Sequence, residues 1–464
     1  MLPAISFQLP AWIVPRVTLP APIPPLEAGG WKLEATMKYY LWTVGCQMNK
    51  ADSEKLAAGF DRLGMKAVDR AERADLVVIN TCSVRQHAED RAYSKLGRVR
   101  DLKKERPTLK VAVMGCMVGL KTGELEKRFP YVDAFARPQQ FGPVMALVEE
   151  PAEDMGGEFW PTTYAVPEGP TAFVPVVHGC NKFCTYCIVP YRRGREKSRP
   201  MDEIVREVGY LTVHGVREVT LLGQTVEAYG HDLAEQPDLG DLMRELSALE
   251  RLERIRFLTS YPKDMTHRIL KTIAELPKVM ECFSLPVQAG SDAVLQSMRR
   301  GYTIGEYLEK IAEVRALMPN AGITTDIIVG YPGETEADFE ATCDVLERLR
   351  FDKVHVAAYS PRPGTIAHRT MADDVPQAVK AERLHRVEEI EERISREINA
   401  SYVGTTQEVL IEGLKHEQPF GRTRTGRLVH VDAPARIGSL VDVRIEHAGP
   451  FSLRGSFVDA LVLA

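Results

Sequence analysis

Short apolar runs alternate with amphipathic stretches through the first third of the chain. The runs at 39–44, 76–79 and 111–114 predict three buried strands, and stretches with helical periodicity such as 52–63 separate them. Strands that alternate with helices in this way are typical of a parallel sheet with helical crossovers. This part of the chain therefore predicts an open parallel-sheet α/β domain.

A second, longer series of strand and helix patterns follows. Six runs in this series predict strands, at 173–177, 219–222, 254–258, 281–287, 323–329 and 354–359. Six strand–helix units fit a partial (β/α)6 barrel better than the closed barrel, which needs eight. Because the chemistry of such barrels lies at the C-terminal ends of the strands, we expect functional residues in the loops that follow these runs.

The pattern changes again in the C-terminal part. A charged, heptad-like stretch at 376–399 predicts a long helix. Beyond it, β-rich segments separated by Gly and Pro stand at 407–411, 428–431, 441–445 and 456–462. About sixty residues of this kind predict a small all-β barrel of the nucleic-acid-binding sort.

These patterns divide the chain into five parts. We expect an N-terminal domain at 37–150, a linker rich in Pro, Gly and Glu at 151–170, a partial barrel at 171–400 and an all-β domain at 401–464. Residues 1–36 carry seven prolines and few charges, which precludes a regular helix. We interpret them as a disordered or mis-called extension.

Composition restricts the class of protein. Of the 464 residues, 44% are hydrophobic and 27% are charged, as in ordinary soluble globular proteins, and no stretch predicts a membrane span. The formal charge of −5 gives no general attraction to nucleic acid, so RNA binding needs a local basic patch. Eight cysteines in a long chain without a secretory signal indicate a reducing cytosol and metal binding. We therefore expect a cytoplasmic location.

Three cysteines, Cys180, Cys184 and Cys187, directly follow the first predicted barrel strand. Their spacing, C-x-x-x-C-x-x-C, is the signature of the radical S-adenosylmethionine (SAM) enzymes. A closed zinc site takes four protein ligands, whereas three thiolates on a cubic iron–sulfur cluster leave one iron open for a small molecule. A zinc ribbon that uses His178 as its fourth ligand is the alternative for the same residues.

A second set of three cysteines is spread along the N-terminal part. Cys46, Cys82 and Cys116 each follow a predicted strand, at intervals of 36 (82 − 46) and 34 (116 − 82) residues. One strand–helix–strand unit takes about 30 or more residues, so the three thiols fall at the strand ends where open α/β sheets bind ligands. Glycines before Cys46 and Cys116 let the backbone approach a bulky cofactor closely. The alternative is three unrelated core cysteines, which is how we interpret Cys282 and Cys343.

Basic side chains gather in two places. Between 181 and 200 six basic residues stand against one acidic residue, whereas the C-terminal part holds seven of each. The first group would contact phosphates or the carboxylate of SAM, and the second would contact phosphates or cover a solvated hairpin. The candidate RNA contacts are Arg192, Arg193, Arg195, Arg422, Arg424 and Arg427.

Together these motifs resemble those of the methylthiotransferase family of radical SAM enzymes, over nearly the whole chain after residue 37. The motifs are Gly-Cys-Gln-Met-Asn at 45–49, Asn-Thr-Cys-Ser-Val-Arg at 80–85, the cysteine loop at 180–191 and Ser-Leu-Arg-Gly at 452–455. The last of them is similar to the end of a TRAM domain, an RNA-binding barrel. The sequence departs from the family at Ser284, where histidine is common, and after Cys116.

The resemblance implies two [4Fe–4S] clusters and SAM as cofactors. The cysteines at 180, 184 and 187 would hold the SAM cluster, and those at 46, 82 and 116 an auxiliary cluster. The SAM contacts that it implies are Tyr186 at the adenine, Gly223 and Gln224 at the methionine group, and Ile328 beside the adenosine.

The implied activity is conversion of C–H to C–SCH3 at C2 of N6-isopentenyladenosine, next to the anticodon of tRNA. A C2–H bond has no acidic proton, which favours a radical route over acid–base catalysis. The implied partners are a tRNA anticodon stem–loop carrying isopentenyladenosine and a low-potential electron donor such as flavodoxin or ferredoxin. We expect a monomer without membrane attachment.

Two alternatives compete with this interpretation. One is a sister methylthiotransferase that acts on threonylcarbamoyl-adenosine or on an aspartate of a ribosomal protein, although Gln-Met-Asn at 47–49 speaks against it. The other is a non-enzymatic, zinc-bearing RNA-binding module, which predicts zinc instead of iron.

Overall fold

The computed structural model describes residues 37–83, 86–119, 121–148 and 164–458. The predicted extension at 1–36, most of the predicted linker and the last six residues lie outside these ranges. Among the residues described, no helix is both long and apolar enough to span a bilayer.

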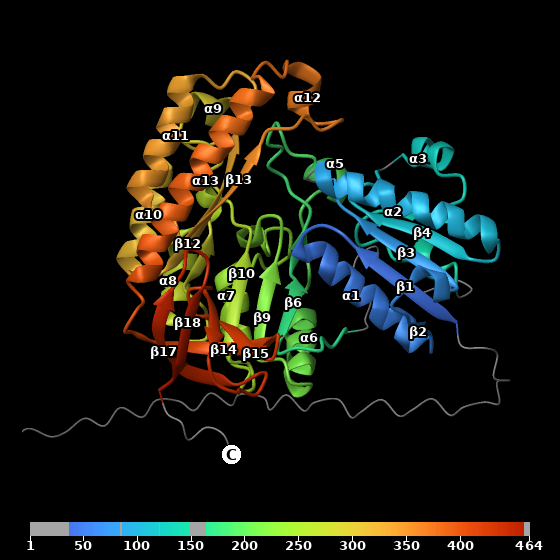
Figure 1. Cartoon of the computed structure of the whole chain (residues 1–464), viewed down its shortest axis with the longest axis horizontal. Coiled ribbons are helices and arrows are strands. Elements are labelled where there is room, and N and C mark those ends of the chain that lie inside the picture. The colour runs from blue at the N-terminus through green and yellow to red at the C-terminus, as the bar shows by residue number, and fades with distance from the viewer. Residues whose placement is uncertain (1–36, 84–85, 120, 149–163, 459–464) are drawn as a thin grey trace, which may run out of the picture. The chain divides into compact units, whose positions relative to one another are not determined.

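The N-terminal sheet has five parallel strands in the order β2-β1-β3-β4-β5 (Figure 1). The strands are β1 (Lys38–Thr43), β2 (Lys66–Ala67), β3 (Leu76–Thr81), β4 (Lys110–Gly115) and β5 (Ala134–Ala136). The helices are α1 (Gln47–Arg62), α2 (Gln86–Glu105), α3 (Gly123–Arg128) and α4 (Gly142–Met145), with a 3-10 turn η1 (Ala71–Arg73). The three predicted strands are confirmed.

Alternate residues of the central strands face opposite sides of this sheet, as the pleat requires. Leu76 and Val78 of β3 pack with Phe60 of α1. Val77 and Ile79 of the same strand lie in a separate cluster with residues of α2. Both faces of the sheet are thus buried, which explains why its strands are continuous apolar runs.

Six further parallel strands form the half barrel, in two three-stranded sheets ordered β6-β9-β10 and β11-β12-β13. An isolated bridge joins Ile255 of the first sheet to Val279, three residues before the second sheet begins. The strands are β6 (Thr171–Pro175), β9 (Glu218–Leu222), β10 (Arg254–Leu258), β11 (Cys282–Ser284), β12 (Gly322–Val329) and β13 (Lys353–Ala358). All six predicted strands are confirmed, but β11 is shorter than predicted because Pro286 has no N–H for the ladder.

Helices and short elements connect these strands. The 3-10 turns are η2 (Val226–Ala228) and η3 (Pro262–Asp264), and the short elements around the cysteine loop are β7 (Val177–His178), α5 (Val189–Arg193) and β8 (Lys197–Ser198). The helices are α6 (Met201–Val213), α7 (Leu239–Ser247), α8 (His267–Glu275), α9 (Asp292–Ser297), α10 (Ile304–Leu317), α11 (Glu336–Leu349), α12 (Ile366–Thr370) and α13 (Gln377–Ala400). α13 is the predicted long helix, and it packs against β13 and α11 (Figure 1).

The C-terminal barrel is a closed sheet in the order β14-β15-β16-β18-β17. Its strands are β14 (Thr406–Lys415), β15 (Gln418–Thr423), β16 (Leu428–Val431), β17 (Leu440–Ala448) and β18 (Leu453–Phe457). Closure leaves no free sheet edge, and buried Val and Ile side chains fill the interior. The predicted all-β barrel, and with it the predicted fold class, is confirmed.

Two junctions connect the half barrel with its neighbours, one with the N-terminal domain and one with the C-terminal barrel. Met48 and Ala51 of α1 pack against Leu222 at the end of β9, which places the start of α1 at the half barrel. On the C-terminal barrel, Glu408 accepts a hydrogen bond of 2.7 Å from Arg254, a fully buried side chain at the start of β10. Each junction brings residues far apart in sequence to one strand end.

Candidate active site

The first cysteine set lies in a tightly folded loop after β7. Gly179 has φ +76°, and a Cβ there would lie 2.0 Å from the carbonyl oxygen of Arg195. The loop closes through a 3.1 Å hydrogen bond from the Cys180 amide to the Gly194 carbonyl. Glycine at 179 is therefore required for the loop to fold back on itself.

The thiols of this set lie close to one another. Burial raises the pKa of Cys180 to about 11 and that of Cys187 to about 12, and the charge of Cys184 acts in the same direction on both. Arg300 approaches from the segment after α9, with its Nη1 3.5 Å from the Sγ of Cys184. Two buried thiols and one half-buried thiol, with an adjacent guanidinium, are a set that suits a thiolate-ligated cluster.

The second cysteine set lies at the C-terminal edge of the N-terminal sheet. Cys46 is the N-cap of α1, whereas Cys82 and Cys116 directly follow β3 and β4. The Sγ atoms of Cys46 and Cys116 lie 3.8 and 4.0 Å from the same atom, Oδ1 of Asn49. The structure therefore brings these distant cysteines together at one strand edge, as their spacing predicts.

The glycines beside this set allow close packing within the protein, whereas the predicted approach to a cofactor stays a prediction. Gly45 has φ +133°, and a Cβ there would lie 2.8 Å from the Cβ of Cys82. Gly115 has φ +95°, and a Cβ there would lie 2.4 Å from the carbonyl oxygen of Thr81. Each glycine thus allows a cysteine-bearing loop to pack directly against the neighbouring strand end.

Arg193 of α5 enters the second set from the half barrel. Burial raises the pKa of Cys116 to about 12, Arg193 opposes the rise, and the charges of Cys82 and Cys46 add to it. The Arg193 side chain is only 2% exposed and forms an ion pair of 3.2 Å with Asp52. Such burial leaves no route to a phosphate, so the prediction of Arg193 as an RNA contact is corrected.

Neither set is arranged around a single metal ion. In the described part of the chain, no three His, Cys, Asp or Glu side chains are placed to hold one ion together. The zinc ribbon through His178 would need four donors around one ion, at about 2.3 Å for each sulfur. A cubic cluster takes each thiolate at a different iron, so its ligands stand farther apart.

The predicted SAM contacts lie at the same end of the half barrel. Gln224 follows β9, and its Oε1 is buried without a hydrogen-bond partner. Buried acceptors are normally hydrogen-bonded, so this oxygen could accept a hydrogen bond from a ligand. A Cβ on Gly223 would lie 2.7 Å from Cγ1 of Val177, so this turn packs against the cysteine loop. Ile328 is half-buried near the end of β12, and burial raises the pKa of Tyr186 well above its usual value.

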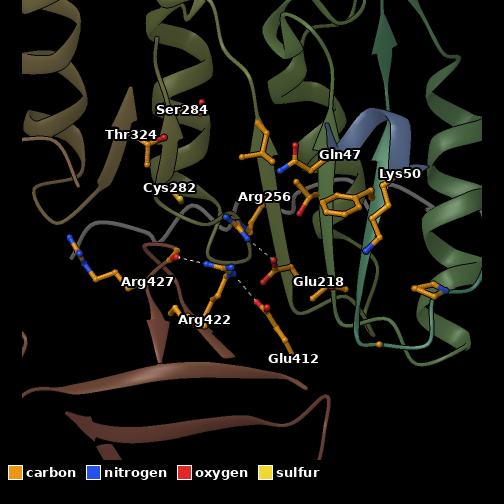
Figure 2. Close-up of a pocket in the computed structure, with 18 of the residues that line it drawn as sticks. Gln47, Lys50, Glu218, Arg256, Cys282, Ser284, Thr324, Glu412, Arg422 and Arg427 are labelled. Carbon is orange, nitrogen blue, oxygen red and sulfur yellow. Dashed lines mark hydrogen bonds and ion pairs between the residues drawn. The ribbon is translucent and has the colours of Figure 1, made fainter. Parts of the chain in front are cut away.

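A cavity of about 1260 Å³ is lined by every strand of the half barrel, by α1 and by the C-terminal barrel (Figure 2). Its floor is charged: Arg256 pairs with Glu218 at 3.5 Å, and Arg422 pairs with Glu412 at 3.4 Å. Gln47, the neighbour of Cys46, also lines it. The cavity therefore extends from the N-terminal end of α1 to the C-terminal barrel.

The remaining predicted RNA contacts differ in exposure. Arg195 is exposed and lies over the ring of Phe183, 4.8 Å from its centroid. Arg424 pairs with Glu281 at 3.0 Å, and buried Arg427 pairs with Asp352, so both tie the C-terminal barrel to the half barrel. Arg192 is half-buried. Among the six candidates, Arg195 is the one whose side chain faces water most fully.

Comparison with known proteins gives three family matches that cover most of the chain. The model of the radical SAM superfamily matches residues 174–346, that of the uncharacterized protein family UPF0004 matches 38–136, and that of the TRAM domain matches 400–458. The tRNA-2-methylthio-N(6)-dimethylallyladenosine synthase of Dehalococcoides mccartyi (strain CBDB1) is 45% identical over 424 residues, 91% of this chain and 99% of that protein. The enzyme of the same name from Chloroflexus aurantiacus is 45% identical over 423 residues, covering 90% and 91%.

The chain belongs to the radical SAM methylthiotransferase family. Membership of the radical SAM superfamily implies SAM and a [4Fe–4S] cluster as cofactors. In fold, this methylthiotransferase is similar to the radical SAM methyltransferase TsrM of Kitasatospora setae, with a TM-score of 0.50 and 14% identity over 80% of this chain and 77% of that one.

Sequence reasoning missed the polar side chains of this methylthiotransferase that surround the thiols. Asn49 stands three residues after Cys46, and Asp52 stands three residues after Asn49, the spacing that brings each pair together on a helix. That spacing was a usable signal. Arg193 and Arg300 carried none, because nothing local relates them to Cys116 and Cys184.

Proposed function

We propose that this chain adds a methylthio group to C2 of N6-isopentenyladenosine next to the anticodon of tRNA. The observation that carries the proposal is the pair of three-cysteine sets at the strand ends of two adjoining sheets, in a chain 45% identical to synthases named for this modification. The TRAM match at 400–458 supports an RNA substrate. Methylthio transfer needs both a sulfur source and a means of activating an inert C–H bond, and two sets supply two sites.

Two [4Fe–4S] clusters fit the two sets. Cys180, Cys184 and Cys187 would hold one, and Cys46, Cys82 and Cys116 the other. When bound, the first cluster with SAM supplies a one-electron route to C–H activation, and the second supplies an iron on which sulfur is held. Each set offers three thiols, which leaves one iron of each cube without a protein ligand.

The protein's own residues would bind and orient SAM and keep water out of the site. The orphan Oε1 of Gln224 would accept a hydrogen bond from the ammonium group of SAM, and Tyr186 would contact its adenine. Gly223 and Ile328 would complete the SAM site. Burial of Cys180 and Cys184, which are 8% and 6% exposed, keeps water from the site.

The nucleoside would be splayed from the anticodon loop into the cavity of about 1260 Å³, since proteins that act on an RNA base take it out of its stack. Of the residues around the cysteines, the cavity lining includes Gln47 but none of the six thiols. Thr220, Ser284 and Thr324 line the cavity and offer hydroxyl groups to the edges of a base. Exposed Arg195 is the preferred phosphate contact. We further propose a flavodoxin or ferredoxin as electron donor and a cytoplasmic monomer as the working form.

Nucleoside mass spectrometry tests the proposal. The chain is expressed in a bacterial strain that lacks its own methylthio modification, and its bulk tRNA is digested. We expect conversion of N6-isopentenyladenosine to its 2-methylthio form, and none with the Cys184→Ala variant. A 2-methylthio group on threonylcarbamoyl-adenosine alone, or on a ribosomal protein by intact mass, would reject the proposed substrate in favour of a sister activity.

Metal analysis tests the cofactors. Anaerobically purified protein should hold about eight irons per chain from two cubic clusters. Cys82→Ala and Cys184→Ala should each lower that number to about four, by emptying different sites. Zinc in place of iron would favour the non-enzymatic RNA-binding module.

A further inference from the structure

Arg193 belongs to the loop of the first cysteine set but reaches the second. It is the last residue of α5, six residues after Cys187. Its Nη2 donates a 2.8 Å hydrogen bond to Oδ1 of Asn49 and lies 3.2 Å from Oδ2 of Asp52. The side chains of Arg193 and Asp52 are 2% and 1% exposed. A cation of the half barrel is thus enclosed by the N-terminal sheet and α1.

The amide of Asn49 connects this cation to the thiols. Its Nδ2 donates to the carbonyl oxygens of Val44 at 3.1 Å and Thr81 at 2.7 Å, which fixes the orientation of the amide. Oδ1 consequently faces the arginine and the Sγ atoms of Cys46 and Cys116 at once. Arg193 therefore lies next to the second set, and the two hydrogen bonds from Nδ2 keep the Asn49 amide oriented toward it.

The positive charge of Arg193 affects any cluster held by the second set. A cluster held by three thiolates carries negative charge to a strand edge where Cys82 and Cys116 are buried and Cys46 is exposed. On the buried side of this set an uncompensated charge is costly. Arginine stays protonated under all working conditions, and its planar fork can contact several acceptors at once. Asp52 opposes it with a negative charge at the same site. The electrostatic balance at the second set therefore depends on a residue that another part of the fold provides.

We propose that Arg193 is a positioning residue of the half barrel for the second cysteine set, and that its charge favours the reduced form of the cluster held there. The proposal rests on the proposed function, in that Cys46, Cys82 and Cys116 hold a [4Fe–4S] cluster. Reduction adds one electron and breaks no bond, so a fixed positive charge nearby stabilises the reduced state over the oxidised one. The docking of the half barrel thereby sets the redox behaviour of a cluster on the N-terminal sheet.

A redox titration of the second cluster tests this inference. Replacing Cys180, Cys184 and Cys187 together with alanine leaves one cluster to observe by electron paramagnetic resonance. At a fixed solution potential, Arg193→Met should lower the ratio of reduced to oxidised cluster at least tenfold, about 59 mV for one electron. Asp52→Asn should raise the ratio, because it removes the opposite charge. A merely structural role would move both variants in the same direction.

The controls use the same loop. Arg195→Met removes an exposed cation two residues away and should leave the titration unchanged. Arg193→Lys keeps the charge, so its ratio of reduced to oxidised cluster should be closer to that of the parent than the ratio in Arg193→Met. Unchanged titrations in Arg193→Met and Asp52→Asn, with four irons retained, would overturn this inference but leave the proposed second cluster standing. Should Arg193→Met not fold, an upward shift in Asp52→Asn supports the inference and its absence overturns it. A background variant without iron would overturn the second cluster itself, and the inference with it.

Discussion

Lys55 of α1 and Glu207 of α6 form an ion pair of 3.3 Å between the N-terminal sheet and the half barrel, and each side chain is only 4% exposed. Arg199 donates to the same carboxylate from its Nη1 at 2.5 Å. One buried carboxylate thus holds two cations that come from different parts of the fold. Because α1 also carries Cys46, this pairing fixes the second cysteine set relative to the first.

Glu207→Gln should destabilise the protein by about 3–5 kcal/mol, because it removes the buried negative charge that both cations contact. Denaturant unfolding under anaerobic conditions measures the loss. Arg206→Ala is the matched control on the same helix, since its pair with Asp202 is exposed and contributes at most about 1 kcal/mol. Equal effects of the two variants would show that the Lys55–Glu207 pair does not hold the junction.

Strands were predictable where burial on both faces produced an apolar run, as in Leu76–Thr81 and Lys110–Gly115. β15, with the sequence Gln-Pro-Phe-Gly-Arg-Thr, was missed because proline, glycine and polar residues carry no strand pattern. Barrel closure alone makes it a strand, through pairing with β14 and β16. Its existence is thus a property of the tertiary fold.

The residues of the candidate site likewise include some that were predictable from the sequence and some that were not. The cysteines were predictable because local spacing and strand topology fix their positions. The partners of the charged residues were not, because Arg193 meets Asp52 across 141 residues and Arg424 meets Glu281 across 143. Charge counting treats such arginines as free to bind phosphate, and only tertiary contacts reveal the acids that neutralise them.

Gly179→Ala should remove the first cluster without unfolding the protein. The new Cβ would lie 2.0 Å from a backbone carbonyl oxygen and would force the cysteine loop open. We expect iron to fall from about eight to about four per chain. Gly209→Ala in α6 is the matched control, since nothing lies within 4 Å of its Cβ. Full iron in Gly179→Ala would mean that the loop folds in another way.

Arg424→Ala should leave the salt dependence of tRNA binding unchanged. Its guanidinium is held by Glu281 at 3.0 Å and by the carbonyl oxygen of Val279 at 2.8 Å, so it neutralises no phosphate. Arg195→Ala, which removes an exposed cation, should reduce the slope of log K against log salt concentration by about 1. Binding assays at several salt concentrations measure both slopes. A reduced slope in Arg424→Ala would instead support the predicted phosphate contact of Arg424.

Glu227 should make the stability of the protein fall as pH rises. The side chain is fully buried in η2, accepts a hydrogen bond from the Tyr261 amide, and has a pKa raised by burial from 4.5 to about 8. Between these values the folded state holds a proton that the unfolded state has lost, so the free energy of unfolding decreases with pH, by at most about 1.4 kcal/mol per unit.

Glu227→Gln keeps the shape and the acceptor but cannot ionise. We expect parent and variant to have similar free energies of unfolding near pH 5, where the carboxyl is neutral in the fold. The variant should become progressively more stable than the parent as pH approaches 8, because only the parent must bury a group that the unfolded chain has ionised. Urea unfolding of both proteins at matched pH values measures the difference. Parallel pH profiles would show that Glu227 is ionised in the fold and stabilised by a cation such as Lys182.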